Sequence, residues 1–120
     1  MLSPEEIAAI AVRALEDKKA ADIKILRTAE QTVIADYFVI CSGSSIPHVR
    51  ALVDEVDRKL SEAGEAPLRR EGRRSDKWVL MDFGSVVVHV FTDEARKFYN
   101  LERLWSDSEE VSLSSLPGPQ

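Results

Sequence analysis

The stretch ADYFVICSGSS, residues 35–45, gives the clearest indication of how this chain folds. Residues 35–41 form a nearly unbroken apolar run rich in aromatic and β-branched side chains, which is typical of a central strand covered on both faces. The run ends in a Gly-Ser turn, where Ser44 or Ser45 is placed to cap a helix. Apolar residues then recur at helical spacing, at Val49, Leu52, Val53, Val56 and Leu60. A buried strand that turns into an amphipathic helix predicts a domain in which helices pack on a sheet.

Capping signals mark the limits of the other helices. Ser3 and Glu6 have the spacing of a capping box, and Pro4 suits the first turn, so a helix is expected to start there. Gly64 is placed to end the helix that follows the central strand. Thr92 is placed to cap a short third helix. Three helices are therefore expected.

Four further segments indicate strands. The clearest are 78–82 and 85–91, which form a hairpin with Gly84 in its turn. Weaker patterns indicate strands at 23–27 and 67–71. The predicted order is α-β-β-α-β-β-β-α, an α/β (α+β) domain with a five-stranded mixed sheet flanked by helices.

The chain has 120 residues, which is enough to bury one hydrophobic core. We expect one domain over residues 1–105 and a disordered tail over 106–120, since the tail is rich in Ser, Glu and Pro. No apolar run approaches the ~20 residues that cross a bilayer. The first residues resemble neither a signal peptide nor a transit peptide. A cytoplasmic protein is expected, although a processed organellar form also fits.

The charge pattern bears on the kind of partner. The formal net charge is −5, which argues against binding mainly through nucleic-acid phosphates and fits a basic protein partner. One segment is locally basic and leaves two interpretations open, a solvated loop or a contact with RNA. Its cationic residues are Arg69, Arg70, Arg73, Arg74 and Lys77.

A search for catalytic chemistry finds only weak signals. Gly43 and Ser44 lie at a strand-to-helix turn, as in some phosphate sites, but a sharp turn with a helix cap also explains them. Glu55 and Asp57 have the carboxylate spacing of a metal-binding triplet. On the expected helix they point ~200° apart and cannot hold one ion. We therefore expect no metal, no cofactor and no enzymatic activity.

The cysteine and histidines indicate packing and not catalysis. Cys41 lies inside the apolar run, so it is expected to be a small buried hydrophobe and not a reactive thiol. His89 lies in the strand VVVHVF and is expected to pack in the sheet. His48 opens the second helix, where it contacts either backbone or solvent. Two histidines without a nearby Cys or carboxylate cluster make a poor zinc site.

The aromatic residues near the C-terminus exceed what one helix face can bury. Phe98 is expected in the core. For Trp78, Tyr99 and Trp105, core and interface positions are equally supported, because Trp and Tyr are enriched among interface anchors.

Several segments together resemble one family. ADYFVICSGSS (35–45) with HVRAL (48–52) resembles its strand-turn-helix signature, and KWVLMDFGSVVVHVF (77–91) after EAGEAPLRREG (62–72) resembles its hairpin. FYNLERLW (98–105) resembles its closing motif. The chain is thereby identified as a member of the ribosome silencing factors, also called Iojap-like proteins. The resemblance implies a nucleotidyltransferase-like fold that lacks the catalytic carboxylates.

The resemblance also implies a function. Such a protein binds the large ribosomal subunit through a basic ribosomal protein of the L-fourteen family and blocks joining of the small subunit when nutrients are short. The matching motifs assign the protein interface to Trp78, Asp82, Tyr99, Glu102 and Trp105. The alternative is a large-subunit assembly or maturation factor that contacts ribosomal RNA. Exposed aromatics equally allow a homodimer off the ribosome.

Overall fold

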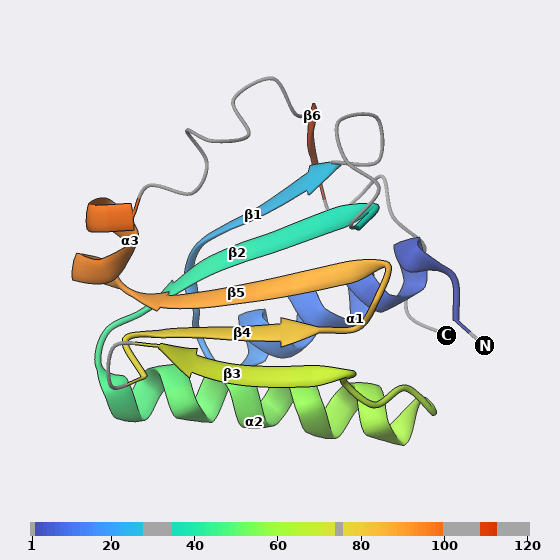
Figure 1. Cartoon of the computed structure of the whole chain (residues 1–120), viewed down its shortest axis with the longest axis horizontal. Helices are drawn as coiled ribbons and strands as arrows, with labels where there is room; N and C mark the ends of the chain where they lie inside the picture. Colours follow the sequence, from blue (N-terminus) through green and yellow to red (C-terminus); the bar gives the residue numbers. More distant parts are fainter. Residues whose placement is uncertain (1, 28–34, 74–75, 100–108, 113–120) are drawn as a thin grey trace.

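The computed structural model describes residues 2–27, 35–73, 76–99 and 109–112 (Figure 1). These residues form three helices and six strands. In order they are α1 (Pro4–Asp17), β1 (Ala21–Arg27), β2 (Tyr37–Gly43), α2 (Ile46–Glu62), β3 (Arg69–Arg73), β4 (Trp78–Asp82), β5 (Val86–Thr92), α3 (Asp93–Tyr99) and β6 (Glu109–Val111). The predicted fold class is confirmed.

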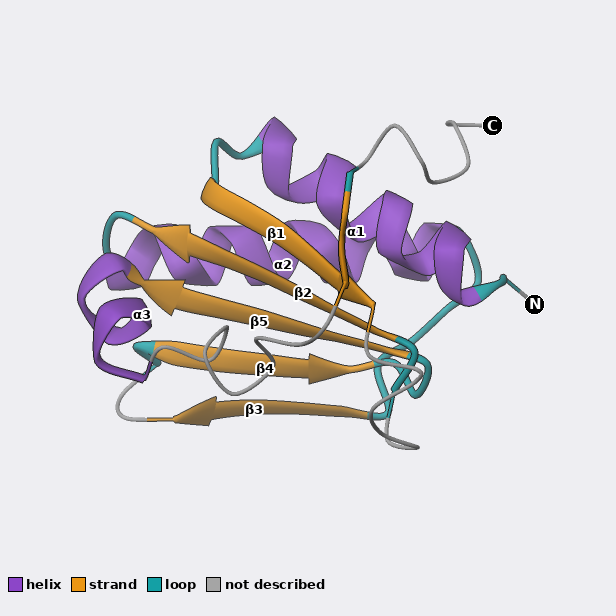
Figure 2. Cartoon of the chain, turned by 90° about the horizontal axis from the view of Figure 1, so that it is seen from above, coloured by secondary structure: helices purple, strands orange, loops and turns teal. Residues whose placement is uncertain are grey.

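The sheet has the strand order β3-β4-β5-β2-β1-β6 (Figure 2). β2 and β5 pair in parallel, from Tyr37 opposite Val86 to Gly43 opposite Thr92. The other four pairings are antiparallel. The sheet is therefore mixed, as predicted, but the predicted number of five strands is wrong.

The sixth strand lies in the segment that was expected to be disordered. Glu109–Val111 pairs with the free edge of β1, with Val111 opposite Ile25. These residues form a strand because the open edge of β1 offers them backbone hydrogen bonds. A local composition rich in Ser and Glu does not indicate such a distant pairing partner. The expectation of disorder is wrong for these three residues, and the rest of 106–120 lies outside the described residues.

The two faces of the sheet are covered differently. α1 and α2 pack on one face and bury the larger part of the core, which includes Leu15, Leu52 and Met81. The opposite face holds a second cluster around Phe38 and Phe91, to which α3 contributes Ala95 and Tyr99. Figure 1 shows α1 and α2 on one side of the strands, and α3 beside the end of β5. Among the described residues, no helix is both long and apolar enough to cross a membrane.

The predicted caps are confirmed. The Ser3 hydroxyl accepts from the Glu6 N–H at 3.1 Å, and the Glu6 carboxylate accepts from the Ser3 N–H at 2.9 Å. Hydrogen bonding of the Glu6 carboxylate to the Ser3 backbone N–H, and next to the Ser3 side chain, lowers the pKa of Glu6. Ser45 caps α2, and Thr92 accepts from the Ala95 N–H at 3.2 Å to cap α3. Gly64 follows α2 with φ +92°, the left-handed conformation that glycine tolerates.

Strand ends differ from prediction by two residues at several places. β2 begins at Tyr37 and includes Ser42 and Gly43, which were expected in the turn, because pairing with β5 continues to Thr92. β1 begins at Ala21, and β3 covers Arg69–Arg73 where 67–71 was expected. Pairing partners, which a single strand does not reveal, set these limits.

Candidate functional site

An aromatic cluster occupies the sheet face on which α3 packs. Trp78 is stacked on Phe91, with ring centroids 5.0 Å apart, and it lies 4.8 Å from the ring of Tyr99. His89 lies beside Trp78 and Phe38, with ring centroids 6.0 and 5.0 Å away. The cluster thus joins β2, β4, β5 and α3. Phe38, His89 and Phe91 are buried, whereas Trp78 and Tyr99 are only partly buried.

A hydrogen bond orients the central tryptophan. The indole Nε1 of Trp78 donates to Nδ1 of His89 at 3.2 Å. Nδ1 is therefore the unprotonated nitrogen, and the imidazole is neutral with its proton on Nε2. The prediction that His89 packs in the sheet is confirmed, since its side chain is 4% exposed. Its link to Trp78 was not foreseen, because it depends on the register that places the two strands side by side.

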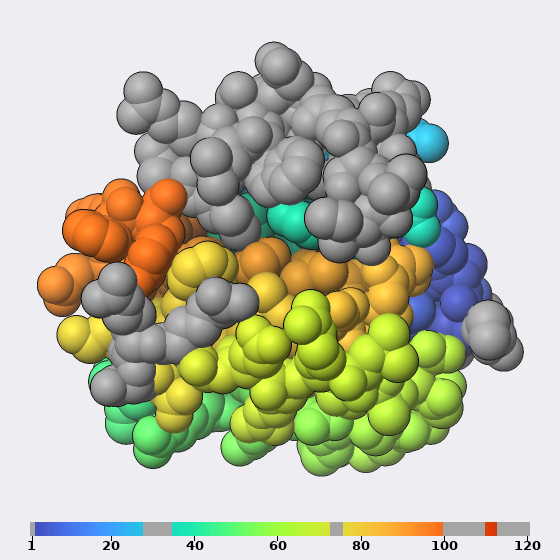
Figure 3. All heavy atoms as spheres, viewed as in Figure 1, coloured from blue at the N-terminus to red at the C-terminus, as the bar shows by residue number. Residues whose placement is uncertain are grey.

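The cluster continues outward at Phe98. Phe98 packs edge-on against Tyr99, with ring centroids 5.0 Å apart, and it is 77% exposed. The prediction that Phe98 belongs to the core is wrong. α3 has only seven residues, and it turns Ala95 and Arg96 inward, which leaves Phe98 facing solvent. We call Trp78, Leu80, Phe98 and Tyr99 the aromatic surface. Figure 3 shows α3, in orange, beside β4, in yellow, on one face of the molecule.

The structure describes three of the five residues assigned to the interface, and it brings two of these three together. Trp78 and Tyr99 are in contact, as described above. Asp82 lies on the same face of the sheet as Trp78, because side chains alternate along a strand. It is at the other end of β4, about 14 Å along the strand. Its carboxylate accepts from the Gly84 N–H at 2.8 Å and lies 3.4 Å from Arg69. Glu102 and Trp105 lie outside the described residues.

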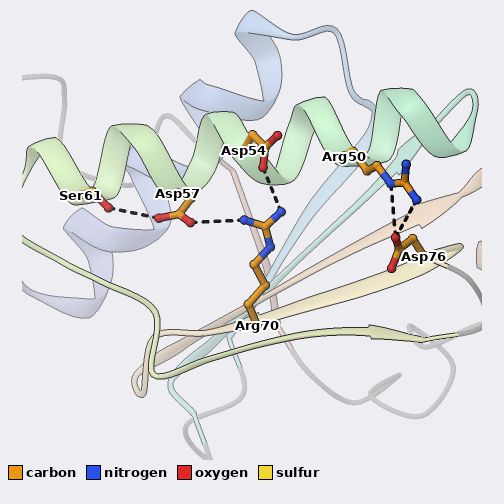
Figure 4. Close-up of polar contacts among 6 residues, drawn as sticks. All are labelled: Arg50, Asp54, Asp57, Ser61, Arg70 and Asp76. Atoms are coloured by element: carbon orange, nitrogen blue, oxygen red, sulfur yellow. Dashed lines mark hydrogen bonds and ion pairs between the residues drawn. The ribbon is translucent and has the colours of Figure 1, made fainter.

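Two arginines of the basic segment form ion pairs within the chain. Arg70 extends from β3 toward α2, where it contacts Asp54 at 2.9 Å and Asp57 at 3.3 Å (Figure 4). Arg69 contacts Glu71 at 3.3 Å and Asp82 at 3.4 Å. These side chains are arranged as intramolecular ion pairs. The side chain of Arg73, and Arg74 as a whole, lie outside the described residues.

The Gly-Ser turn has a structural explanation. A Cβ atom on Gly43 would lie 3.0 Å from Cγ2 and 3.2 Å from the backbone nitrogen of Val49, so a larger residue would require Val49 to shift by a few tenths of an ångström. The Ser44 N–H donates to Nδ1 of His48 at 2.9 Å. Nε2 of His48 lies 2.7 Å from the Lys18 carbonyl oxygen and donates to it, since Nδ1 is the acceptor. His48 thereby ties the end of α1 to the start of α2.

Glu55 and Asp57, whose spacing resembles that of a metal-binding triplet, face different partners. Glu55 is buried against Arg58, whose guanidinium donates to it at 2.8 and 3.2 Å. These bonds are the main cause that lowers the pKa of Glu55. Asp57 accepts from the Ser61 hydroxyl at 3.1 Å and contacts Arg70, as Figure 4 shows. Over the described ranges, no group of three His, Cys, Asp or Glu side chains is placed to hold a metal ion.

The single cysteine is confirmed as a buried apolar residue. Cys41 is fully buried in β2. Burial raises the pKa of its thiol to about 12. The thiolate, which is the reactive form, is therefore scarce at neutral pH.

An α+β domain whose partly exposed aromatic residues gather on one face has the features of a protein-binding domain. Residues 2–120 match the family described as "Ribosomal silencing factor during starvation". The chain belongs to this family. The family description names an effect on the ribosome and no chemical reaction.

Relatives match over nearly the whole chain. The ribosomal silencing factor of Halalkalibacterium halodurans is 41% identical over 96% of this chain and 98% of its own length. That of Bacillus subtilis is 41% identical over 93% and 95%. A crystal structure from Chromobacterium violaceum superposes with a TM-score of 0.84 at 39% identity and covers 92% of both chains.

A more distant relative has another name. The mouse protein called "Mitochondrial assembly of ribosomal large subunit protein 1" is 35% identical over 79% of this chain, which spans 43% of the mouse protein. The name of that protein refers to assembly, not to silencing.

Proposed function

We propose that this protein represses translation by binding the large ribosomal subunit and sterically blocking joining of the small subunit. The contact is made to a basic ribosomal protein of the L-fourteen family, and repression serves periods of nutrient limitation. Membership in the ribosomal silencing factor family supports the effect on translation. The mechanism requires a stable contact and no reaction, and it places the protein in the cytoplasm with the ribosomes.

The observation that carries the proposal is the aromatic surface. Phe98 is 77% exposed, and Trp78 and Tyr99 beside it are partly exposed. Burying a large apolar side chain contributes about 1.5–3 kcal/mol. Burial of Phe98 alone would therefore supply a substantial fraction of the binding free energy of a micromolar complex. The ring of Trp78 is held in place by the buried rings of Phe91 and His89, which lowers the entropy that this side chain loses on binding.

The charge of the chain suits the proposed partner. The formal net charge is −5, and α3 begins with the exposed residues Asp93 and Glu94 near the aromatic surface. Electrostatic attraction between an acidic chain and a basic protein speeds their encounter and orients the partner. Aromatic anchors with acidic residues beside them therefore fit a basic protein better than they fit ribosomal RNA.

The interface must extend beyond the aromatic surface. A specific interface buries about 800 Å² on each partner and involves roughly 20 residues. Asp82 lies on the same sheet face, so a partner that reaches along β4 covers it at the rim. Glu102 and Trp105 complete the proposed set.

The direct test is calorimetry with a purified L-fourteen-family protein. Phe98→Ala is expected to weaken binding by about 2 kcal/mol, roughly 30-fold. Leu68→Ala is the matched control, since Leu68 is 73% exposed but lies before β3, outside the aromatic surface. Equal effects of the two variants would contradict the proposed site, and no binding of the wild type would contradict the proposed partner.

A second candidate is assembly or maturation of the large subunit. The name of the mouse relative favours it. RNA contact would use Arg69, Arg70, Arg73 and Arg74, of which Arg69 and Arg70 already contact carboxylates. This function predicts tight binding to naked ribosomal RNA that falls steeply with salt. Silencing through a protein contact predicts weak RNA binding.

The same aromatic surface offers a contact between two copies off the ribosome. Such a homodimer would cover Phe98 and would compete with ribosome binding. Sedimentation of wild type and Phe98→Ala distinguishes it, because only the wild type should then show a concentration-dependent dimer.

A further inference from the structure

A second feature of the molecule lies where its two parallel strands end. β2 continues into α2, which packs on one face of the sheet, and β5 continues into α3, which packs on the other. The chain therefore leaves two adjacent parallel strands in opposite directions. In open α/β sheets, ligands bind outside the carboxyl ends of the strands at such a point. Figure 2 shows α3 at this edge of the sheet, next to the ends of β2 and β5.

The structure has a hollow at this edge. Its volume is about 750 Å³, within the range of small-molecule sites. The lining comes from the start of β1, the end of β2 and α3. The polar residues that line it are Asp22, Lys24, Ser42, Asp93, Arg96 and Lys97.

Arg96 is the fixed element of this hollow. It is 8% exposed, although arginine is rarely buried to this extent. Its Nη1 donates to the Ser42 hydroxyl at 3.1 Å and to the carbonyl oxygen of Asp22. These two bonds fix the guanidinium beside β1 and β2. Arginine has five N–H donors in a rigid fork that matches phosphate geometry.

The backbone of β1 is irregular at the hollow. Asp22 has φ +49°, and the pairing of β1 with β2 shifts register between Ala21 and Lys24. Such bulges bend a strand and redirect its groups, and they are frequent next to functional sites. Here the irregularity accompanies the Asp22 carbonyl that Arg96 contacts.

From these features we propose that the hollow binds a sugar phosphate of nucleotide size. Arg96 and Lys97 supply two cationic groups for the phosphates, and Lys24 adds a third, although its Nζ also lies 3.9 Å from the Glu110 carboxylate. Asp22 and Asp93 disfavour a long polyanion and can accept hydrogen bonds from sugar hydroxyls. The ligand would lie beside α3, the helix that also carries Phe98 and Tyr99 of the aromatic surface.

Titration of the full chain with ADP, followed by amide NMR, tests this. ADP is expected to cause saturable shifts at Ser42 and along α3, and inorganic phosphate is expected to bind the same site more weakly. Lys97→Glu should lower ADP affinity roughly tenfold or more, since a charged hydrogen bond is lost and a repulsion is added. Lys59→Glu, the control, reverses a charge near the end of α2, away from the hollow, and should leave the affinity unchanged.

Three results would overturn the proposal. They are shifts that do not saturate, an ADP affinity that Lys97→Glu leaves unchanged, and tighter binding of a short single-stranded RNA than of ADP at the same residues. Circular dichroism of both variants confirms that they are folded. Because the readout is ligand binding without ribosomes, its failure leaves the proposed silencing function untouched.

Discussion

Trp78 donates a hydrogen bond from its indole Nε1 to Nδ1 of His89, 3.2 Å away, across the β4–β5 pairing. The two residues lie on adjacent strands but are not directly opposite each other. Trp78 lies opposite Phe91, and Leu80 lies opposite His89, so the bond runs diagonally across the pair of strands. The bond fixes the ring that is also stacked on Phe91. A partly exposed anchor is thereby oriented before any partner arrives.

This relationship predicts coupling between the two residues. His89→Phe removes the acceptor, and Trp78→Phe removes the donor. A double-mutant cycle of the free energy of unfolding, measured with urea, should give a coupling of about 0.5–1.5 kcal/mol. Trp78→Phe with Phe38→Leu is a comparison cycle without a hydrogen bond. Additive effects of Trp78→Phe and His89→Phe would show that the bond does not orient the indole.

Gly43 is predicted to be required for packing and not for ligand binding. An added methyl group would meet Val49 at 3.0 Å and Leu52 at 3.3 Å, so Gly43→Ala should lower the free energy of unfolding by about 1–3 kcal/mol. Ser44→Ala, at an exposed neighbouring position, should change it by less than about 0.5 kcal/mol. Urea unfolding measures both. A fully stable Gly43→Ala protein would refute the close approach of α2.

Glu55 and Asp57 are predicted to contribute to stability and not to binding. Glu55→Gln and Asp57→Asn should bind large subunits as the wild type does, because each carboxylate faces an arginine within the chain. Co-sedimentation measures this, with circular dichroism to confirm folding. Loss of binding in a folded variant would restore a functional role for the triplet.

The contact between Glu55 and Arg58 predicts that the stability of the fold depends on pH. The hydrogen bonds from Arg58 lower the pKa of Glu55 in the folded state below its ordinary value of about 4.3. Its contribution is therefore fully present above that value and is lost as the pH falls through the lower, folded-state pKa. Below pH ~4, the wild type should lose stability more steeply than Glu55→Gln. Parallel curves for the two proteins, measured by thermal unfolding, would contradict this.

Cys41 is predicted to be unreactive in the folded protein. Its thiol is fully buried and has a pKa of about 12, so alkylation by iodoacetamide at pH 8 should be very slow and should become fast in concentrated urea. Mass spectrometry follows the reaction. Rapid labelling of the native protein would mean that β2 opens readily.

Local patterns predicted much of this fold, and the reasons are physical. The caps at Ser3, Ser45 and Thr92 were readable because a cap needs only residues within one turn of the helix. The buried run at 35–41 indicated β2 because a strand covered on both faces has few polar positions. β6 was missed because its order depends on the edge of β1, far away in the chain.

The candidate site was less predictable than the fold. Trp78 and Tyr99 were singled out by residue type, and the structure places them in contact. Phe98 was assigned to the core because periodicity does not reveal that α3 has only seven residues. The pairing of Arg70 with Asp54 and Asp57 requires β3 to pass beside α2, which no sequence spacing indicates. The nucleotidyltransferase likeness of the fold stays a prediction.

Co-sedimentation with purified large subunits, with and without small subunits, tests directly whether this protein silences ribosomes by steric exclusion. The wild type is expected to pellet with large subunits and to prevent small subunits from joining them. Trp78→Ala and Tyr99→Ala should remain in the supernatant while staying folded, and Leu68→Ala should behave as the wild type does. A wild type that stays in the supernatant, or that pellets equally with assembled ribosomes, would contradict silencing by steric exclusion.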